Sequence, residues 1–69
     1  EENSINPNTA SRDELMRLPG IGEVMAVRIL EAREEGKFRT AEDLGRVSGI
    51  GEKTVRRLTP YLSFGDTPQ

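Results

Sequence analysis

The 69-residue chain contains no cysteine and no histidine. Without cysteine it cannot form a disulfide framework, and this absence is compatible with an extracytoplasmic or a cytoplasmic location. Without histidine it lacks the commonest general base and the commonest metal ligand. These absences argue against an enzyme, and we expect no catalytic residue, no metal site and no cofactor.

Aromatic residues and long apolar runs are also scarce. No run approaches the roughly 18 apolar residues that a membrane span needs. Lysine and arginine number 10 and aspartate and glutamate 12, which gives a net charge of −2. This charge counts against a strongly basic nucleic-acid binder, although the local distribution of charge matters more than the sum. The length suits one domain with a modest core, which we place at residues 1–69.

The chain contains an internal repeat of two units, with an offset of 29 residues that relates Gly20 to Gly49. The run Gly-Ile-Gly-Glu occurs at residues 20–23 and again at residues 49–52. A unit with a single apolar face cannot bury that face alone, so we expect the two units to pack about a pseudo-two-fold axis. The sequence therefore divides into a tail at 1–8, a first repeat at about 11–36, a second repeat at about 40–64 and a tail at 65–69.

Four segments carry helix signals, and few stretches alternate in the manner of a strand. Ser11 and Glu14 form a capping box, in which the hydroxyl and the carboxylate satisfy free backbone amides, and Thr40 with Asp43 forms a weaker version. Capping explains these acidic residues, so they do not indicate a metal site. The pattern predicts an all-α domain, with helices at about 12–17, 23–35, 41–46 and 52–59.

Two segments outside these helices are expected to contact the core. Phe38 anchors the connection between the two units. Pro60 cannot continue a helix, so it ends the last one. Beyond it, Tyr61, Leu62 and Phe64 are expected to form a final turn that closes over the core.

Each Gly-Ile-Gly lies between two predicted helices. The glycines permit backbone angles that other residues avoid, and they leave room for close approach. Ile21 and Ile50 are expected to point inward and hold each turn against the core. The first amides of the helices that follow have no intrahelical partners and carry the positive end of the helix dipole. Backbone amides of this kind can bind phosphate, and they carry no sequence information.

A single Gly-x-Gly between helices is most often only a helix end and a turn. Two copies in the same helical context indicate a unit of architecture, although repetition does not by itself prove a ligand. The charges differ between the copies, because Val24 follows the first hairpin where Lys53 follows the second. Lys53 and Arg57 share a helix face at spacing i, i+4, so we expect both to contact phosphate and the second hairpin to be the stronger site.

The runs Leu-Pro-Gly-Ile-Gly (18–22) and Val-Ser-Gly-Ile-Gly (47–51) resemble helix–hairpin–helix motifs. Together with Gly-Lys-Phe at 36–38 and Pro-Tyr-Leu at 60–62, they resemble the DNA-binding domain of ComEA-type competence proteins, the receptors for incoming DNA in natural transformation. The resemblance covers nearly all of residues 5–64. It implies a compact tandem domain of four to five short helices that binds double-stranded DNA by its phosphates.

The resemblance also implies an extracytoplasmic location, with any membrane contact made by segments outside this chain, and a monovalent cation on the backbone carbonyls of a hairpin. Many hairpins of the family carry proline after the second glycine, where this chain has Glu23 and Glu52. A carboxylate there favours the helix start but competes with phosphate. The expected phosphate-binding residues are Gly20, Gly22, Val24, Gly49, Gly51, Lys53, Thr54 and Arg57.

The remaining charges receive plainer interpretations. Arg28 repeats Arg57, and it is expected either to contact phosphate or to pair with Glu31 or Glu35. The arginines of the first helix in each unit are interpreted as ordinary surface charge: Arg12, Arg17 and Arg46. The acidic residues of the long helix are expected to face away from DNA: Glu31, Glu34 and Glu35.

Two other functions stay open from the sequence. The same fold serves as a protein–protein interaction module, which the low charge and the apolar Val24–Met25 pair favour. It also occurs as an accessory domain of larger DNA repair or processing enzymes, which would suit a cytoplasmic location. A gel-shift assay with unlabelled duplex DNA distinguishes a protein–protein interaction module from a DNA-binding domain.

Overall fold

A computed structural model describes residues 4–64 of the chain, and helices joined by turns and irregular segments make up that range. Three α-helices and two 3₁₀-helices follow one another, and the described residues contain no strand, only an isolated bridge between Ile5 and Leu62. The all-α prediction is therefore confirmed. The elements are α1 (Arg12–Leu15), α2 (Glu23–Glu35), η1 (Ala41–Arg46), α3 (Glu52–Leu58) and η2 (Thr59–Tyr61).

The starts of the predicted helices are confirmed, because local capping sets them. Ser11 accepts from the backbone N–H of Glu14 at 3.1 Å, and the Glu14 carboxylate accepts from the Ser11 N–H at 3.0 Å. Helix α2 matches its predicted bounds. Helix α1 ends earlier than expected, at Leu15, because the amides of Arg17 and Leu18 donate to carbonyls only three residues back, and because the residue before Pro19 is disfavoured in a helix.

The second unit is helical where expected, but its first helix is a 3₁₀-helix, which is wound more tightly than an α-helix. Residues 41–46 form a 3₁₀-helix, since Gly45 stands at the position that Met16 holds in the first unit and glycine weakens an α-helix. Helix α3 ends at Leu58, and η2 follows with Pro60 in its first turn. Thr59 is therefore the first residue of η2 and not the last of an α-helix.

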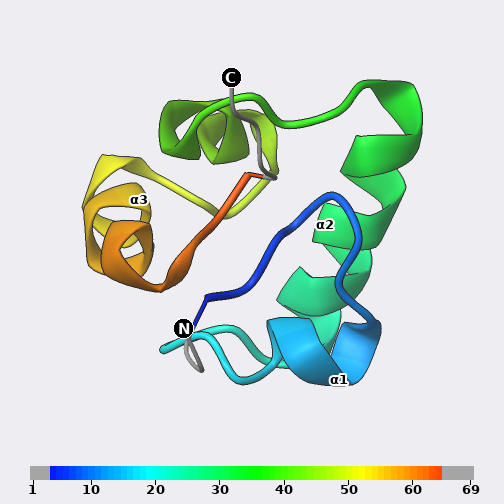
Figure 1. Cartoon of the computed structure of the whole chain (residues 1–69), viewed down its shortest axis with the longest axis horizontal. Helices are drawn as coiled ribbons and strands as arrows, with labels where there is room; N and C mark the ends of the chain where they lie inside the picture. Colours follow the sequence, from blue (N-terminus) through cyan, green and yellow to red (C-terminus); the bar gives the residue numbers. More distant parts are fainter. Residues whose placement is uncertain (1–3, 65–69) are drawn as a thin grey trace.

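The core repeats with the same 29-residue offset as the sequence. Helix α1 packs on α2 and η1 packs on α3, and Figure 1 shows these pairs as two units on opposite sides of the molecule. Five repeat-related pairs are buried: Leu15 with Leu44, Leu18 with Val47, Ile21 with Ile50, Ala26 with Val55 and Ile29 with Leu58. Burying both apolar faces against each other stabilises units too small to fold alone.

Residues 5–8 belong to the packed domain, although we expected residues 1–8 to form a tail; residues 1–3 lie outside the described range. The Ile5 N–H donates to the Tyr61 carbonyl at 2.8 Å, and Pro7 is fully buried. The Asn8 side chain exchanges two hydrogen bonds with the Phe38 backbone, at 2.7 and 2.8 Å. In Figure 1 this segment, in blue, passes between α2 and α3. The sequence did not indicate this packing because the partners of the segment lie more than 20 residues away. The predicted tail at 65–69 lies outside the described residues.

Arg33 fixes the same segment to α2. Its Nη1 atom donates to the carbonyl oxygens of Pro7 at 3.0 Å and Ala10 at 2.7 Å. These two carbonyls have no partner in a strand or helix, so the arginine satisfies backbone groups that would otherwise be left without a hydrogen bond in a partly buried place.

The end of the described chain closes over the core only in part. Leu62 and Phe64 are half-buried against the core, as expected, but Tyr61 is 38% exposed. Backbone hydrogen bonds also hold this segment, because the Tyr61 carbonyl accepts from the Ile5 N–H at 2.8 Å and the Ser63 N–H donates to the Ile5 carbonyl at 2.9 Å. None of the helices within residues 4–64 is long and apolar enough to span a lipid bilayer.

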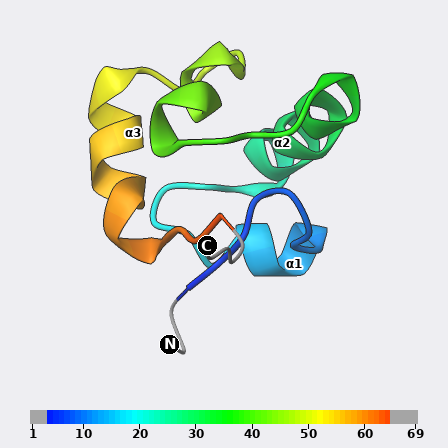
Figure 2. The same ribbon diagram turned by 45° about the horizontal axis from the view of Figure 1, so that its top comes forward.

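The connection between the units crosses from the end of α2 to η1, as Figure 2 shows. Phe38 anchors it, with 1% of its surface exposed, which confirms the prediction. Arg46, expected to be ordinary surface charge, lies over the Phe38 ring at 4.5 Å from its centroid. It also donates to the carbonyl oxygens of Ala32 and Gly36. These carbonyls belong to the last turn and the end of α2, where they lack intrahelical donors and attract a cation.

Candidate functional site

The two hairpins have the same hydrogen bonds at an offset of 29 residues. In the first, the Ile21 N–H donates to the Leu18 carbonyl at 3.1 Å, and in the second the Ile50 N–H donates to the Val47 carbonyl at 3.0 Å. Both isoleucine side chains are about 5% exposed or less, so they hold the turns against the core as expected. The repeat in the sequence is thus a repeat in backbone geometry.

The two glycines of each hairpin have different roles. Gly20 and Gly49 adopt left-handed conformations, with φ of 81° and 98°, which L side chains avoid. Gly22 and Gly51 have extended backbones, with φ of −96° and −101°, which any residue can adopt. The expectation that both glycines are needed for their backbone angles is therefore wrong for Gly22 and Gly51.

Gly22 and Gly51 are the N-caps of α2 and α3, and neither has a side chain to satisfy the first helix amides. A β-carbon built on either glycine would meet no atom within 4 Å. The first amides of the two helices therefore have no side-chain cap, the space beside each N-cap glycine is open, and both starts carry the positive end of a helix dipole. The geometry suits a small anion or a phosphate group at each start.

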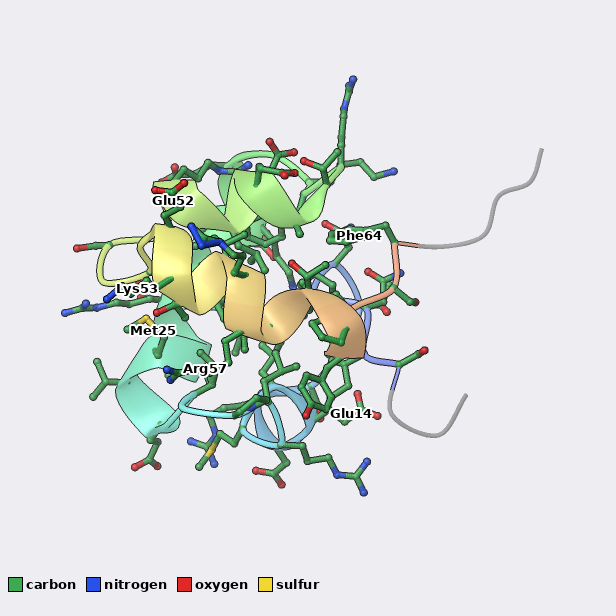
Figure 3. The ribbon with its side chains drawn as sticks, turned by 90° about the vertical axis from the view of Figure 1, so that its left-hand side faces the viewer. Glu14, Met25, Glu52, Lys53, Arg57 and Phe64 are labelled. Atoms are coloured by element: carbon green, nitrogen blue, oxygen red, sulfur yellow. The ribbon has the colours of Figure 1, made fainter. Side chains whose placement is uncertain are left out.

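The side chains that follow the two hairpins differ. Val24 is 66% exposed and offers an apolar surface, whereas Lys53 is exposed and offers an ammonium group. Thr54 is half-buried one residue further on. Figure 3 shows Lys53, Met25 and Arg57 one below another at the edge of α3 that meets the first unit. Lys53 and Arg57 thus lie on the side of α3 that faces Met25 of α2 (Figure 3).

An arginine from each unit lies against the hairpin of the other unit: Arg28 at the second hairpin and Arg57 at the first. Arg28 Nη1 donates to the Ser48 carbonyl at 2.9 Å. A β-carbon built on Gly49 would lie 3.0 Å from the same nitrogen and 2.7 Å from Met25 Cε, so α2 lies directly against the second hairpin. Reciprocally, Arg57 Nη1 lies 3.9 Å from a β-carbon built on Gly20. The two hairpins are therefore neighbours on one surface.

The glutamates at the helix starts each have an arginine partner. Glu23 pairs with Arg12 at 3.5 Å across α1 and α2, and Glu52 pairs with Arg56 at 3.5 Å within α3. These pairs are largely exposed and contribute little to stability. They do offset the negative charge that the two carboxylates would otherwise place beside the free amides. Arg12 remains the exposed surface charge that we expected, and its partner is Glu23 of α2.

One titratable group has a shifted pKa. The Asp43 carboxylate accepts from the backbone N–H of Arg39 at 2.7 Å and that of Thr40 at 3.3 Å. The bond from Arg39 contributes most, and together with the bond from Thr40 and nearby arginine charge it outweighs desolvation and lowers the pKa of Asp43. The group caps η1 and is not part of the hairpin surface. In the described part of the chain no acidic cluster is arranged to hold a metal ion.

Sequence reasoning did not identify the role of Arg28 or the place of Met25. Arg28 was expected to contact phosphate or to pair with Glu31 or Glu35, but its hydrogen bond goes to a backbone carbonyl 20 residues away. The one available signal was its match with Arg57 in the repeat. That match shows that the two arginines occupy equivalent positions, but it does not show what lies opposite them.

A family model described as the helix-hairpin-helix motif matches residues 1–63. ComE operon protein 1 of Bacillus subtilis is 46% identical over 60 residues, which is 86% of this chain and 29% of that protein. DNA polymerase III PolC-type of Staphylococcus epidermidis is 45% identical over 51 residues, which is 74% of this chain and 4% of the polymerase. The first of these similarities confirms the resemblance to ComEA-type competence proteins.

A third relative comes from vertebrates. Endonuclease/exonuclease/phosphatase family domain-containing protein 1 of Xenopus laevis is 47% identical over 55 residues, which is 78% of this chain and 10% of that protein. The chain therefore spans less than a third of each of these three relatives. Most of every such protein has no counterpart in the sequence described here.

Proposed function

Because this chain belongs to the helix-hairpin-helix motif family, we propose that it binds duplex DNA through backbone phosphates, without sequence preference and without catalysis. The observation that carries the proposal is the pair of neighbouring hairpins, each followed by a helix start with no side-chain cap and with open space beside its N-cap glycine. Backbone amides recognise the phosphate that every nucleotide carries and do not read base edges.

Each proposed site residue has a physical role. Gly20 and Gly49 make the turns, and Gly22 and Gly51 leave room for phosphate oxygens to reach the amides. Val24, Lys53 and Thr54 supply amides or side chains in the first helical turn. Lys53 adds positive charge in the first turn after the second hairpin, which is therefore proposed to be the stronger site. Arg57, expected to contribute there too, places its guanidinium beside Gly20 of the first hairpin. A monovalent cation on the hairpin carbonyls remains part of the proposal by family resemblance.

The charge of the domain limits its affinity. The net charge of −2 supplies no long-range attraction to DNA, and Glu52 lies beside the stronger site. We propose that about two to four phosphates are neutralised, which corresponds to a slope of log K against log salt of roughly −2 to −4. Binding is then weak, sensitive to salt and similar for unrelated duplexes.

For the whole protein we propose a role as a receptor in DNA uptake, outside the cytoplasm, with membrane contact made by segments outside this chain. The similarity to ComE operon protein 1 over 86% of the chain supports this role. A second role is an accessory DNA-binding domain of a larger cytoplasmic DNA-processing protein. The similarity to a PolC-type polymerase, over 74% of the chain, favours that alternative.

Titration of the domain with two duplexes of unrelated sequence, at several salt concentrations, tests the DNA-binding proposal. We expect equal affinities for the two duplexes and a linear dependence of log K on log salt.

The variants Gly22→Ser and Gly51→Ser test the site. Both positions are extended and open, so the fold tolerates serine, while the added side chain competes for the helix amides. Thr9→Ser, at an exposed position of the N-terminal segment, is the control. The proposal is contradicted if the double variant Gly22→Ser/Gly51→Ser binds DNA as tightly as the parent domain, or if the parent strongly prefers one duplex.

A further inference from the structure

Arg28 and Arg57 occupy equivalent positions in the two repeats, but their surroundings differ. Arg28 donates to the Ser48 carbonyl at the turn of the second hairpin, at 2.9 Å. The residue equivalent to Ser48 in the first hairpin is Pro19. Among residues 4–64, no hydrogen bond or ion pair within the protein engages the Arg57 guanidinium.

The two hairpins are also supported to different extents. At Gly49, a β-carbon would meet Met25 Cε at 2.7 Å and Arg28 Nη1 at 3.0 Å, so the second hairpin lies tightly against α2. At Gly20, the nearest atom to a β-carbon is Arg57 Nη1 at 3.9 Å, which is ordinary contact. The second hairpin is therefore held by the first unit, whereas the first hairpin has no equally close support from the second.

From this difference we propose that the two arginines have divided roles: Arg28 positions the second hairpin, and Arg57 contacts phosphate. The proposal rests on the proposed function, because positioning matters only if the hairpin binds a ligand. Arg28 donates a hydrogen bond to the Ser48 carbonyl in the turn, and this bond fixes the direction of the helix start at Gly51. Arg57 keeps its donors free beside the first hairpin, on the surface that both hairpins share.

A positioning residue and a phosphate ligand affect the salt dependence differently. Each phosphate contact contributes about 0.9 to the slope of log K against log salt, because binding releases condensed counterions. Removing a residue that only holds the hairpin lowers affinity but leaves the number of neutralised phosphates unchanged. Exchange of the Ile50 and Ile21 amides, which close the second and first turns, reports the rigidity of each hairpin without any DNA.

The experiment compares Arg28→Met with Arg57→Met, a pair that removes the guanidinium and keeps the aliphatic stem. For Arg28→Met we expect an affinity about three- to tenfold lower with an unchanged slope, since one hydrogen bond is lost. Its Ile50 amide should exchange faster while the Ile21 amide does not. For Arg57→Met we expect the slope to become shallower by about 0.9, with no change at either amide.

The opposite pattern overturns the proposal. Arg28 is a phosphate ligand and not a positioning residue if two results are found together. Arg28→Met makes the slope of log K against log salt as shallow as Arg57→Met does, and it leaves the exchange rate of the Ile50 amide unchanged. If the parent domain binds no duplex, the proposed function fails, and the amide exchange of the free variants still decides whether Arg28 holds the second hairpin. Arg28 is exposed, so the variant is expected to fold, and its circular dichroism spectrum checks this.

Discussion

The guanidinium group of Arg46 lies over the ring of Phe38, 4.5 Å from its centroid, and donates to carbonyl oxygens at the end of α2. One side chain thus joins the end of the first unit, the connection and the second unit. A planar guanidinium can stack on a ring and donate in its own plane at the same time, whereas an ammonium group cannot.

Replacement of Arg46 by methionine should lower the free energy of unfolding by about 1–2 kcal/mol, because the cation–π contact and the carbonyl hydrogen bonds are lost. Arg17→Met is the matched control, since Arg17 holds the equivalent exposed position in the first unit. Urea denaturation of both variants measures the difference. Equal losses at the two positions would show that the contact with Phe38 contributes nothing specific.

Alanine at Gly49 should destabilise the domain by about 1–2 kcal/mol, because φ there is 98° and L residues are strained in that region. Met25 Cε is the flexible end of a side chain and can move, so the backbone angle is the larger cost. Gly51→Ser, at an extended N-cap, should leave stability within about 0.5 kcal/mol of the parent. Thermal unfolding compares the two variants, and a larger loss for Gly51→Ser than for Gly49→Ala would contradict the assignment of roles to the glycines.

Lys53→Glu should weaken DNA binding about tenfold and shallow the salt slope by about 1, by similar amounts on unrelated duplexes. Val24→Glu should weaken it less, because no cation is lost there. Lys37→Glu, in the exposed connection after α2, is the matched control for the change in net charge. Fluorescence anisotropy at several salt concentrations measures all three, and equal losses for Lys53→Glu and Val24→Glu would remove the asymmetry between the hairpins.

The cap of η1 should make the domain sensitive to acid. The pKa of Asp43 is lowered in the folded state, so its stabilising effect is complete above the ordinary aspartate pKa and is lost as pH falls through the lowered value. Stability should therefore decline below about pH 4. Asp43→Asn should be less stable at neutral pH and show a flatter decline in acid, whereas Glu42→Gln should follow the parent. An unchanged acid decline in Asp43→Asn would assign the effect to other carboxylates.

Features set by neighbouring residues could be predicted from the sequence. The helix starts follow from Ser11, Thr40 and the hairpin glycines, whose effects extend over one turn of chain. The inward isoleucines follow from their place between two helix ends. The end of α1 and the 3₁₀ winding of η1 were not predicted, because Pro19 and Gly45 shorten or tighten a helix by amounts that tertiary contacts decide, whereas the bounds of η1 match the expected 41–46.

Features set by distant partners could not be predicted. Asn8 pairs with Phe38, Arg33 with Pro7, and Arg28 with Ser48, across separations of 20 to 30 residues. Nothing in the local sequence distinguishes these side chains from solvated ones. The same limit explains the error at Gly51, because the motif shows that two glycines are present but not which of them has a positive φ.

The bridge between Ile5 and Leu62 places the two ends of the described chain side by side. A polypeptide that enters and leaves this domain therefore does so at nearly one point. Such a domain can be carried as an insertion in a longer chain without separating the parts on either side of it. It can equally be tethered by one end with its hairpin surface left accessible, and it can be moved between protein architectures as a single unit.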